Sequence, residues 1–136
     1  MKFDSERDKP IFIMRKGSLL VHGATDCVKE ALKEKIAFHS EDGDDYTVTV
    51  SAAKRLPLQV LTPIDEVTPE EAKSLVIARL EKEDKEIFEF LDGQTFSGPQ
   101  AAAEVRASTG IGNYFFDLEK ETLRIVQQAF FSGDFS

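Results

Sequence analysis

The first part of the chain is patterned as short strands around one helix. Two apolar runs, at 11–15 and 18–22, are divided by Lys16 and Gly17, a pair typical of a β-hairpin turn. From about 26 to 35 the apolar residues recur every three or four positions with charged residues between them, which predicts an amphipathic helix. This stretch therefore predicts a hairpin followed by a helix.

The period then returns to two residues. Segments 36–40 and 46–52 alternate apolar and polar side chains, and the acidic loop 41–45 between them contains an Asp-Gly pair suited to a tight turn. We predict a second hairpin from this pattern. A further strand is predicted at 58–61, restricted to a sheet edge or a strand start because Pro57 has no N–H to donate.

Helical patterning dominates the rest of the chain. Thr68 is placed to cap a helix, Pro69 suits the first helical position, and Glu71 stands where a capping box needs its carboxylate. We predict that this helix runs over 69–91 and stops near the Asp-Gly pair at 92–93.

Two more helices are predicted toward the C-terminus. Ser97 and Gln100 repeat the capping-box spacing, which predicts a short helix that ends with Gly110 as its C-cap glycine. A last helix is predicted over 113–131. Its apolar residues at helical spacing are Phe115, Leu118, Ile125, Val126, Ala129 and Phe130.

These elements define an α+β fold class. We expect one domain over 1–136, because this length can bury a core without disulfides or metals. Its sheet-rich half, 1–63, is predicted to hold a two-hairpin antiparallel sheet with one helix in a ββαββ-like order. Its helical half, 64–136, is predicted to hold three helices packed as one unit with the sheet.

Composition narrows the class of protein. The chain has 17 basic and 25 acidic residues, a net charge of −8, and this balance argues against direct binding of nucleic acid, which requires lysine and arginine to neutralise phosphates. The longest clean apolar run, 11–14, is far too short to span a membrane, and the first nine residues are charged and resemble no signal peptide. Cys27 is the only cysteine, so an internal disulfide is excluded. We expect a cytoplasmic protein.

Charge and phenylalanine are unevenly distributed, and this points to a protein partner. Residues 69–136 hold 7 basic and 13 acidic groups, and eleven phenylalanines occur with no tryptophan. We predict a small acidic non-catalytic protein that binds another protein with a basic surface, as an inhibitor, a toxin-neutralising protein or a chaperone-like regulator, or that forms a homodimer. The predicted partner-binding residues are Glu81, Glu83, Asp84, Glu86, Phe88, Phe90, Phe130, Phe131 and Phe135.

Two structural expectations accompany this prediction. Glu83, Asp84 and Glu86 are expected on a solvated helix face. The Phe-rich C-terminal tail is expected to fold back onto the core of its own chain, and insertion into a partner or a second copy is the alternative.

A small-ligand site is the first alternative function. Gly110, Gly112 and Asn113 precede a predicted helix, where backbone amides favour an anion, and Arg106 is near in sequence. A nucleotide or another phosphate-bearing ligand would suit this turn. The segment lacks a phosphate-loop or dinucleotide fingerprint, so a plain connector between helices is the competing interpretation.

A small enzyme is the second alternative. Cys27 is predicted in the first turn of the helix at 26–35, where a thiol pKa is lowered, and His22 or His39 could act as its base. The spacing matches no cysteine-enzyme signature, and no ligand spacing typical of zinc occurs. The acidic loop 41–45 is too short for a calcium loop of the helical type and is expected to be a solvated turn. We therefore predict no catalytic residue, no metal and no cofactor.

Overall fold

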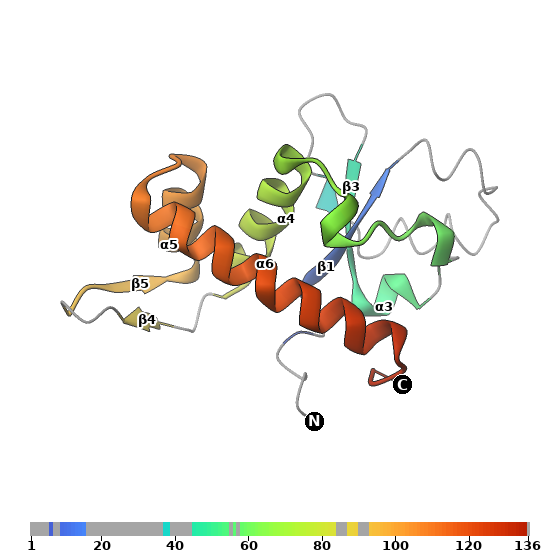
Figure 1. Cartoon of the computed structure of the whole chain (residues 1–136). Coiled ribbons are helices and arrows are strands. Elements are labelled where there is room, and N and C mark those ends of the chain that lie inside the picture. Colours follow the sequence, from blue (N-terminus) through green and yellow to red (C-terminus); the bar gives the residue numbers. More distant parts are fainter. Residues whose placement is uncertain are drawn as a thin grey trace.

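The computed structural model describes residue 6 and residues 9–15, 37–38, 45–54, 56, 58–83, 87–89 and 93–135. In these ranges the chain forms an α+β fold with two antiparallel sheets (Figure 1). Its elements are β1 (Pro10–Arg15), β2 (Ala37–Phe38), β3 (Asp45–Thr49), α3 (Val50–Ala53), η2 (Leu58–Val60), η3 (Ile64–Glu66), α4 (Pro69–Glu81), β4 (Ile87–Glu89), β5 (Thr95–Ser97), α5 (Gly98–Arg106) and α6 (Gly110–Phe131).

The larger sheet has the order β1-β3-β2, with β3 antiparallel to both neighbours. Ala37 and Phe38 pair with Thr47 and Tyr46, so the antiparallel pairing predicted for segments 36–40 and 46–52 is confirmed, whereas positions 39–44 between them lie outside the described residues. The predicted strand at 18–22 and the predicted helix at 26–35 lie outside the described residues. The ββαββ-like order therefore stays a prediction.

Two strand predictions around this sheet are wrong. Strand β3, at the centre of the sheet, ends at Thr49 and is followed by α3. One helical turn brings Val50 and Ala53 into the core together, whereas a strand would point them to opposite faces. Residues 58–60 form the 3-10 helix η2 and not a strand. Prolines at 57 and 63 bracket this segment, and Thr62 forms an isolated bridge to the sheet, where its N–H donates to the Ile13 carbonyl (3.0 Å).

The start of α4 is confirmed, but its predicted end is wrong. The Thr68 hydroxyl accepts from the Glu71 N–H (3.1 Å), and the Glu71 carboxylate accepts from the Thr68 N–H (2.8 Å), which completes the capping box. The helix ends at Glu81 and not near 91. Residues 87–89 instead form β4 and pair with β5, and Gly93 takes a left-handed φ of 87° in the connection. A strand forms here because Ile87 and Phe88 are residue types favoured in strands and Gly93 accommodates the turn that lets them pair with β5.

The connection from α5 to α6 also differs from the prediction. The capping box of Ser97 and Gln100 is present, as predicted. Helix α6 starts at Gly110 and not at 113, because the Thr109 hydroxyl accepts from the Gly112 N–H (3.0 Å) and caps the helix. Gly110 is therefore the first helical residue and not a C-cap glycine. The left-handed position after α5 is taken by Ser108, at φ 55°.

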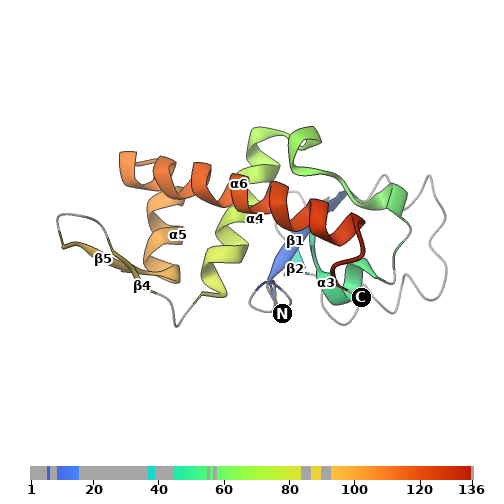
Figure 2. The ribbon, with the colours of Figure 1, turned by 60° about the horizontal axis from the view of Figure 1, so that its bottom comes forward.

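Helix α6 runs along the length of the described fold and crosses α5, α4 and the β1–β3 sheet in turn (Figures 1 and 2). Side chains from the sheet and from the helices form one buried core. Phe12 on β1, Leu75 on α4, and Phe115 and Leu123 on α6 are all at most 1% exposed within it. The core thus lies on one side of α6 and holds that face in place.

Candidate protein-binding surface

Helix α6 carries a second apolar face that points away from the core. Tyr114, Leu118 and Ile125 are 54%, 45% and 57% exposed. Their spacings of four and seven residues place them within an arc of about 40° around the helix axis. We call these three residues the α6 outer face.

The opposite side of α6 is buried, which fixes the direction of the outer face. Phe115, Leu123 and Val126 are at most 1% exposed. Gly112 lies so close to α5 that a Cβ there would stand 2.1 Å from the carbonyl oxygen of Glu104. The two helix backbones are therefore in contact at the start of α6, and α6 cannot rotate to bury its outer face without breaking this packing.

The charged residues of α6 that are exposed are acidic. Asp117 and Glu121 are exposed, whereas Lys120 and Arg124 are partly buried. The Lys120 ammonium lies 5.4 Å from the centroid of the Phe116 ring. Cations near the outer face are thus already engaged within the chain.

Arg124 joins α6 to η3. Its Nε donates to Asp65 Oδ1 (2.9 Å), and its Nη1 also binds the Glu121 carboxylate. Asp65 and Glu66 on η3 are exposed. The outer face is therefore apolar along its centre and acidic along the edge that carries Asp117 and Glu121.

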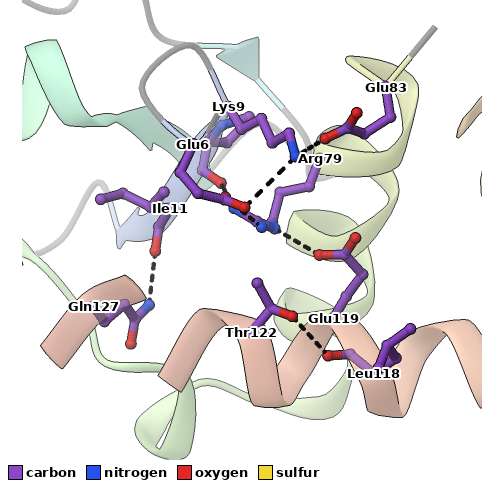
Figure 3. A network of polar contacts seen from close by, with 10 residues as sticks. Glu6, Lys9, Ile11, Arg79, Glu83, Leu118, Glu119, Thr122 and Gln127 are labelled. Atoms are coloured by element: carbon purple, nitrogen blue, oxygen red, sulfur yellow. Dashed lines mark hydrogen bonds and ion pairs between the residues drawn. The ribbon is translucent and has the colours of Figure 1, made fainter. Parts of the chain in front are cut away.

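A buried ion cluster lies on the core side of α6 (Figure 3). The Arg79 side chain, 1% exposed, donates from Nε to Glu119 Oε2 (3.0 Å), from Nη1 to the Pro10 carbonyl (3.1 Å) and from Nη2 to Glu6 Oε2 (2.6 Å). Lys9 pairs with Glu6 (3.6 Å) and with Glu83. Because all three Arg79 nitrogens are engaged, the cluster connects the N-terminal segment, α4 and α6, and its role is structural.

Gln127 makes a second buried connection between distant segments. Its side-chain carbonyl accepts from the Ile64 N–H (2.8 Å), and its amide donates to the Ile11 carbonyl (2.7 Å). These bonds hold α6 to η3 and to β1. The helix is therefore anchored at both of its ends and at its middle.

Of the acidic residues predicted to bind a partner, the two that the structure describes, Glu81 and Glu83, do not share a solvated face. The expectation for Glu83 is wrong: its side chain is buried and paired with Lys9, which approaches from a part of the chain far away in sequence. Glu81 is exposed and paired with Arg106 of α5. Asp84 and Glu86 lie outside the described residues.

Phenylalanines predicted as anchors fall in three different environments. Phe130 packs edge-on against Phe12 with ring centroids 5.3 Å apart, and Phe135 is 1% exposed, so the expectation that the tail folds back onto its own core is confirmed. Phe131 also contacts Phe12 but remains 46% exposed. The backbone of Phe88 lies opposite that of Phe96 in the β4–β5 pair, and Phe90 lies outside the described residues.

Three of the residues predicted to hold a phosphate lie in the first turn of α6, and the fourth, Arg106, ends α5 and pairs with Glu81. Gly110, Gly112 and Asn113 are helical and do not form a flexible turn. The absence of a side chain at Gly112 serves the contact with α5. A carboxylate of the chain itself is present at this helix start, because Glu104 accepts a hydrogen bond from the Thr109 hydroxyl (2.6 Å). The ligand site stays a prediction.

The residues of the enzyme hypothesis, His22, Cys27 and His39, lie outside the described residues. Where the structure is described, no three His, Cys, Asp or Glu side chains are grouped as a metal site requires. Within the same ranges, none of the helices has both the length and the apolar character needed to cross a membrane.

Comparison with known proteins gives no relative. No protein-family model matches the chain. Neither the curated proteins nor the solved structures contain a significant match.

One signal in the sequence points to the outer face. At 100° per residue, Ile125, Leu118, Phe115, Val126 and Leu123 spread over about 160° around the α6 axis, wider than the stripe of about 100° that a single core contact needs. Such an arc indicates either a helix covered on two sides or a helix with an exposed apolar face. The exposure of Leu118 and Ile125 shows the second case.

Proposed function

We propose that this chain is a small non-catalytic protein that acts by binding another protein through the α6 outer face. The observation that supports the proposal is the exposure of Tyr114, Leu118 and Ile125 along one line of a helix whose opposite side is firmly packed. Inhibition, neutralisation of a toxin and chaperone-like binding would all begin with this step.

The energetics of such a face favour association. Burial of one large apolar side chain contributes about 1.5–3 kcal/mol, and a few central anchors commonly supply most of the binding free energy of an interface. A tyrosine at one end adds a large ring with a polar hydroxyl, which suits an interface that is dry at its centre and wet at its rim. The face is preorganised, because the core side of α6 holds it in place before the partner arrives.

Site-specific photo-crosslinking in cells that express the chain from its own gene tests the proposal. A photoreactive amino acid replaces Leu118, and the matched control replaces Leu58, which is 58% exposed on η2. We expect a crosslinked protein of discrete mass from position 118 and none from position 58. The proposal fails if position 118 gives no crosslink, or if both positions give the same products.

A further inference from the structure

We infer that the occupant of the α6 outer face is an amphipathic helix with basic flanks that lies along α6. This inference rests on the proposed function and adds the shape and the charge of the partner. It draws on two observations about the same helix, the spacing of its exposed apolar residues and the sign of its exposed charges.

The spacing favours a helix as the partner. Tyr114, Leu118 and Ile125 are separated by four and seven residues, which is the spacing of the a and d positions of a heptad. The line they form is about 16 Å long at 1.5 Å per residue, or about three helical turns. A helix laid along this line can place its own apolar residues between them, as in helix-in-groove recognition and in coiled coils. A partner strand would instead need an exposed backbone edge, which the side of a helix does not offer.

The charges favour a basic partner. Asp117 is exposed beside the outer face, and the exposed carboxylates of Glu121 and Asp65 share the one cation of Arg124, so this group of charges stays net negative. A partner with lysine or arginine beside its apolar stripe would meet these carboxylates and would be steered toward them.

The same charges oppose a second copy of the chain as the occupant. Two copies, each with a net charge of −8, would bring acidic rims together. Release of Arg124 to face the other copy would leave Asp65 without the ion pair that it makes now. Like charges brought together at an interface weaken the wrong pairing, so homodimerisation through this face is disfavoured.

Two designed peptides test the inference. Each has about 18 residues, or about five helical turns, with leucine at every a and d position. One carries lysine and the other glutamate at the e and g positions, so that each peptide repels its own copies equally. Fluorescence anisotropy at about 0.15 M salt gives the affinity of the full chain for both peptides.

We expect the lysine peptide to bind at least tenfold more tightly than the glutamate peptide. The double variant Leu118→Asn/Ile125→Asn changes no charge and should weaken the lysine peptide at least tenfold, whereas Leu58→Asn should leave its affinity unchanged. Asp117→Asn should weaken it about two- to fivefold, and Asp134→Asn, the same change at an exposed site beyond α6, should not.

Three results would overturn the inference. The first is equal binding of the two peptides. The second is an affinity for the lysine peptide that the outer-face variants leave unchanged, because its binding would then depend on net charge alone. The third is a dimer in sedimentation that Leu118→Asn dissociates, since a second copy would then be the occupant. If Leu118 still crosslinks a different protein in cells, the first two results reject the basic helix and leave the proposed function standing. The third result, in which Leu118 crosslinks a second copy of the chain, rejects both.

Discussion

Arg79 on α4 and Glu119 on α6 form a buried ion pair that joins two helices 40 residues apart, with 3.0 Å between Nε and Oε2. Both side chains are on the core side of α6, and Glu6 and the Pro10 carbonyl complete the set of partners around the guanidinium (Figure 3). A buried arginine is tolerated only when its donors are satisfied. The pair therefore fixes how α6 lies on α4, and with it which side of α6 faces outward.

Loss of the Arg79 charge should be costly. Arg79→Leu removes the cation paired with the buried Glu119 and leaves Glu6 with Lys9 alone, and it should lower the free energy of unfolding by about 3–5 kcal/mol in urea denaturation. Arg106→Leu is the matched control, because Arg106 pairs with Glu81 at the surface and should cost less than about 1 kcal/mol. Equal losses in the two variants would show that the buried pair has no special role.

The two glycines at the start of α6 should respond in opposite directions. A Cβ at Gly112 would collide with the Glu104 carbonyl, so Gly112→Ala should lower the free energy of unfolding by about 3 kcal/mol. Gly110 has open space around its Cβ position and no positive φ, so Gly110→Ala should raise it by about 0.4–1 kcal/mol. Chemical denaturation of both variants checks this, and a destabilised Gly110→Ala would contradict the packing described.

Ser108 holds a left-handed conformation that glycine adopts at lower cost. At φ 55° it follows the C-cap of α5, and its hydroxyl accepts from the Lys73 ammonium (2.8 Å) at the surface. Ser108→Gly should raise the free energy of unfolding by about 0.5–1 kcal/mol, because the relief of backbone strain exceeds the loss of an exposed hydrogen bond. Ser108→Ala removes the same hydrogen bond but keeps the strain, and it should not stabilise. A glycine variant no more stable than the alanine variant would refute this explanation.

The C-terminal tail should contribute to stability through Phe135 more than through Phe131. Phe135 is 1% exposed, and its backbone carbonyl accepts a hydrogen bond from Lys54. Phe135→Ala should cost about 3 kcal/mol, whereas Phe131→Ala, at a ring that is 46% exposed, should cost about 1 kcal/mol. Urea denaturation of the two variants measures the difference. A negligible loss of unfolding free energy in Phe135→Ala would contradict this prediction and show that the tail is dispensable for stability.

The parts of the fold that the sequence predicts correctly depend on local signals. Thr68 and Ser97 begin helices because a hydroxyl and a carboxylate or amide three residues later satisfy the first free N–H groups, and this needs no distant partner. The end of α4 was mispredicted where two local signals compete. Apolar residues at 87, 88, 90 and 91 fit a helix by spacing, but Ile87 and Phe88 are also favoured in strands, an Asp-Gly pair follows, and pairing with β5 decides the outcome.

The candidate site was only partly predictable, because burial depends on residues far apart in sequence. Glu83 looks solvated within an acidic run, yet Lys9 arrives from the N-terminal segment and pairs with it. The sequence near Arg79 does not indicate that Glu6 and Glu119 are its partners, because both are distant in the chain. The sequence does indicate a wide apolar arc on α6, because Leu118 and Ile125 extend it. Which part of that arc is buried depends on packing against α4 and α5.

The account depends most on the claim that the α6 outer face is where a partner helix docks. Methyl NMR of the full chain, titrated with the lysine-flanked peptide, observes that face directly. The methyl signals of Leu118 and Ile125 should shift most on titration. Those of Leu58, exposed on η2, and of Leu123, buried on the core side of α6, should stay in place or move little. Shifts concentrated on Leu58 or elsewhere away from α6, or no shifts at all, would contradict the claim.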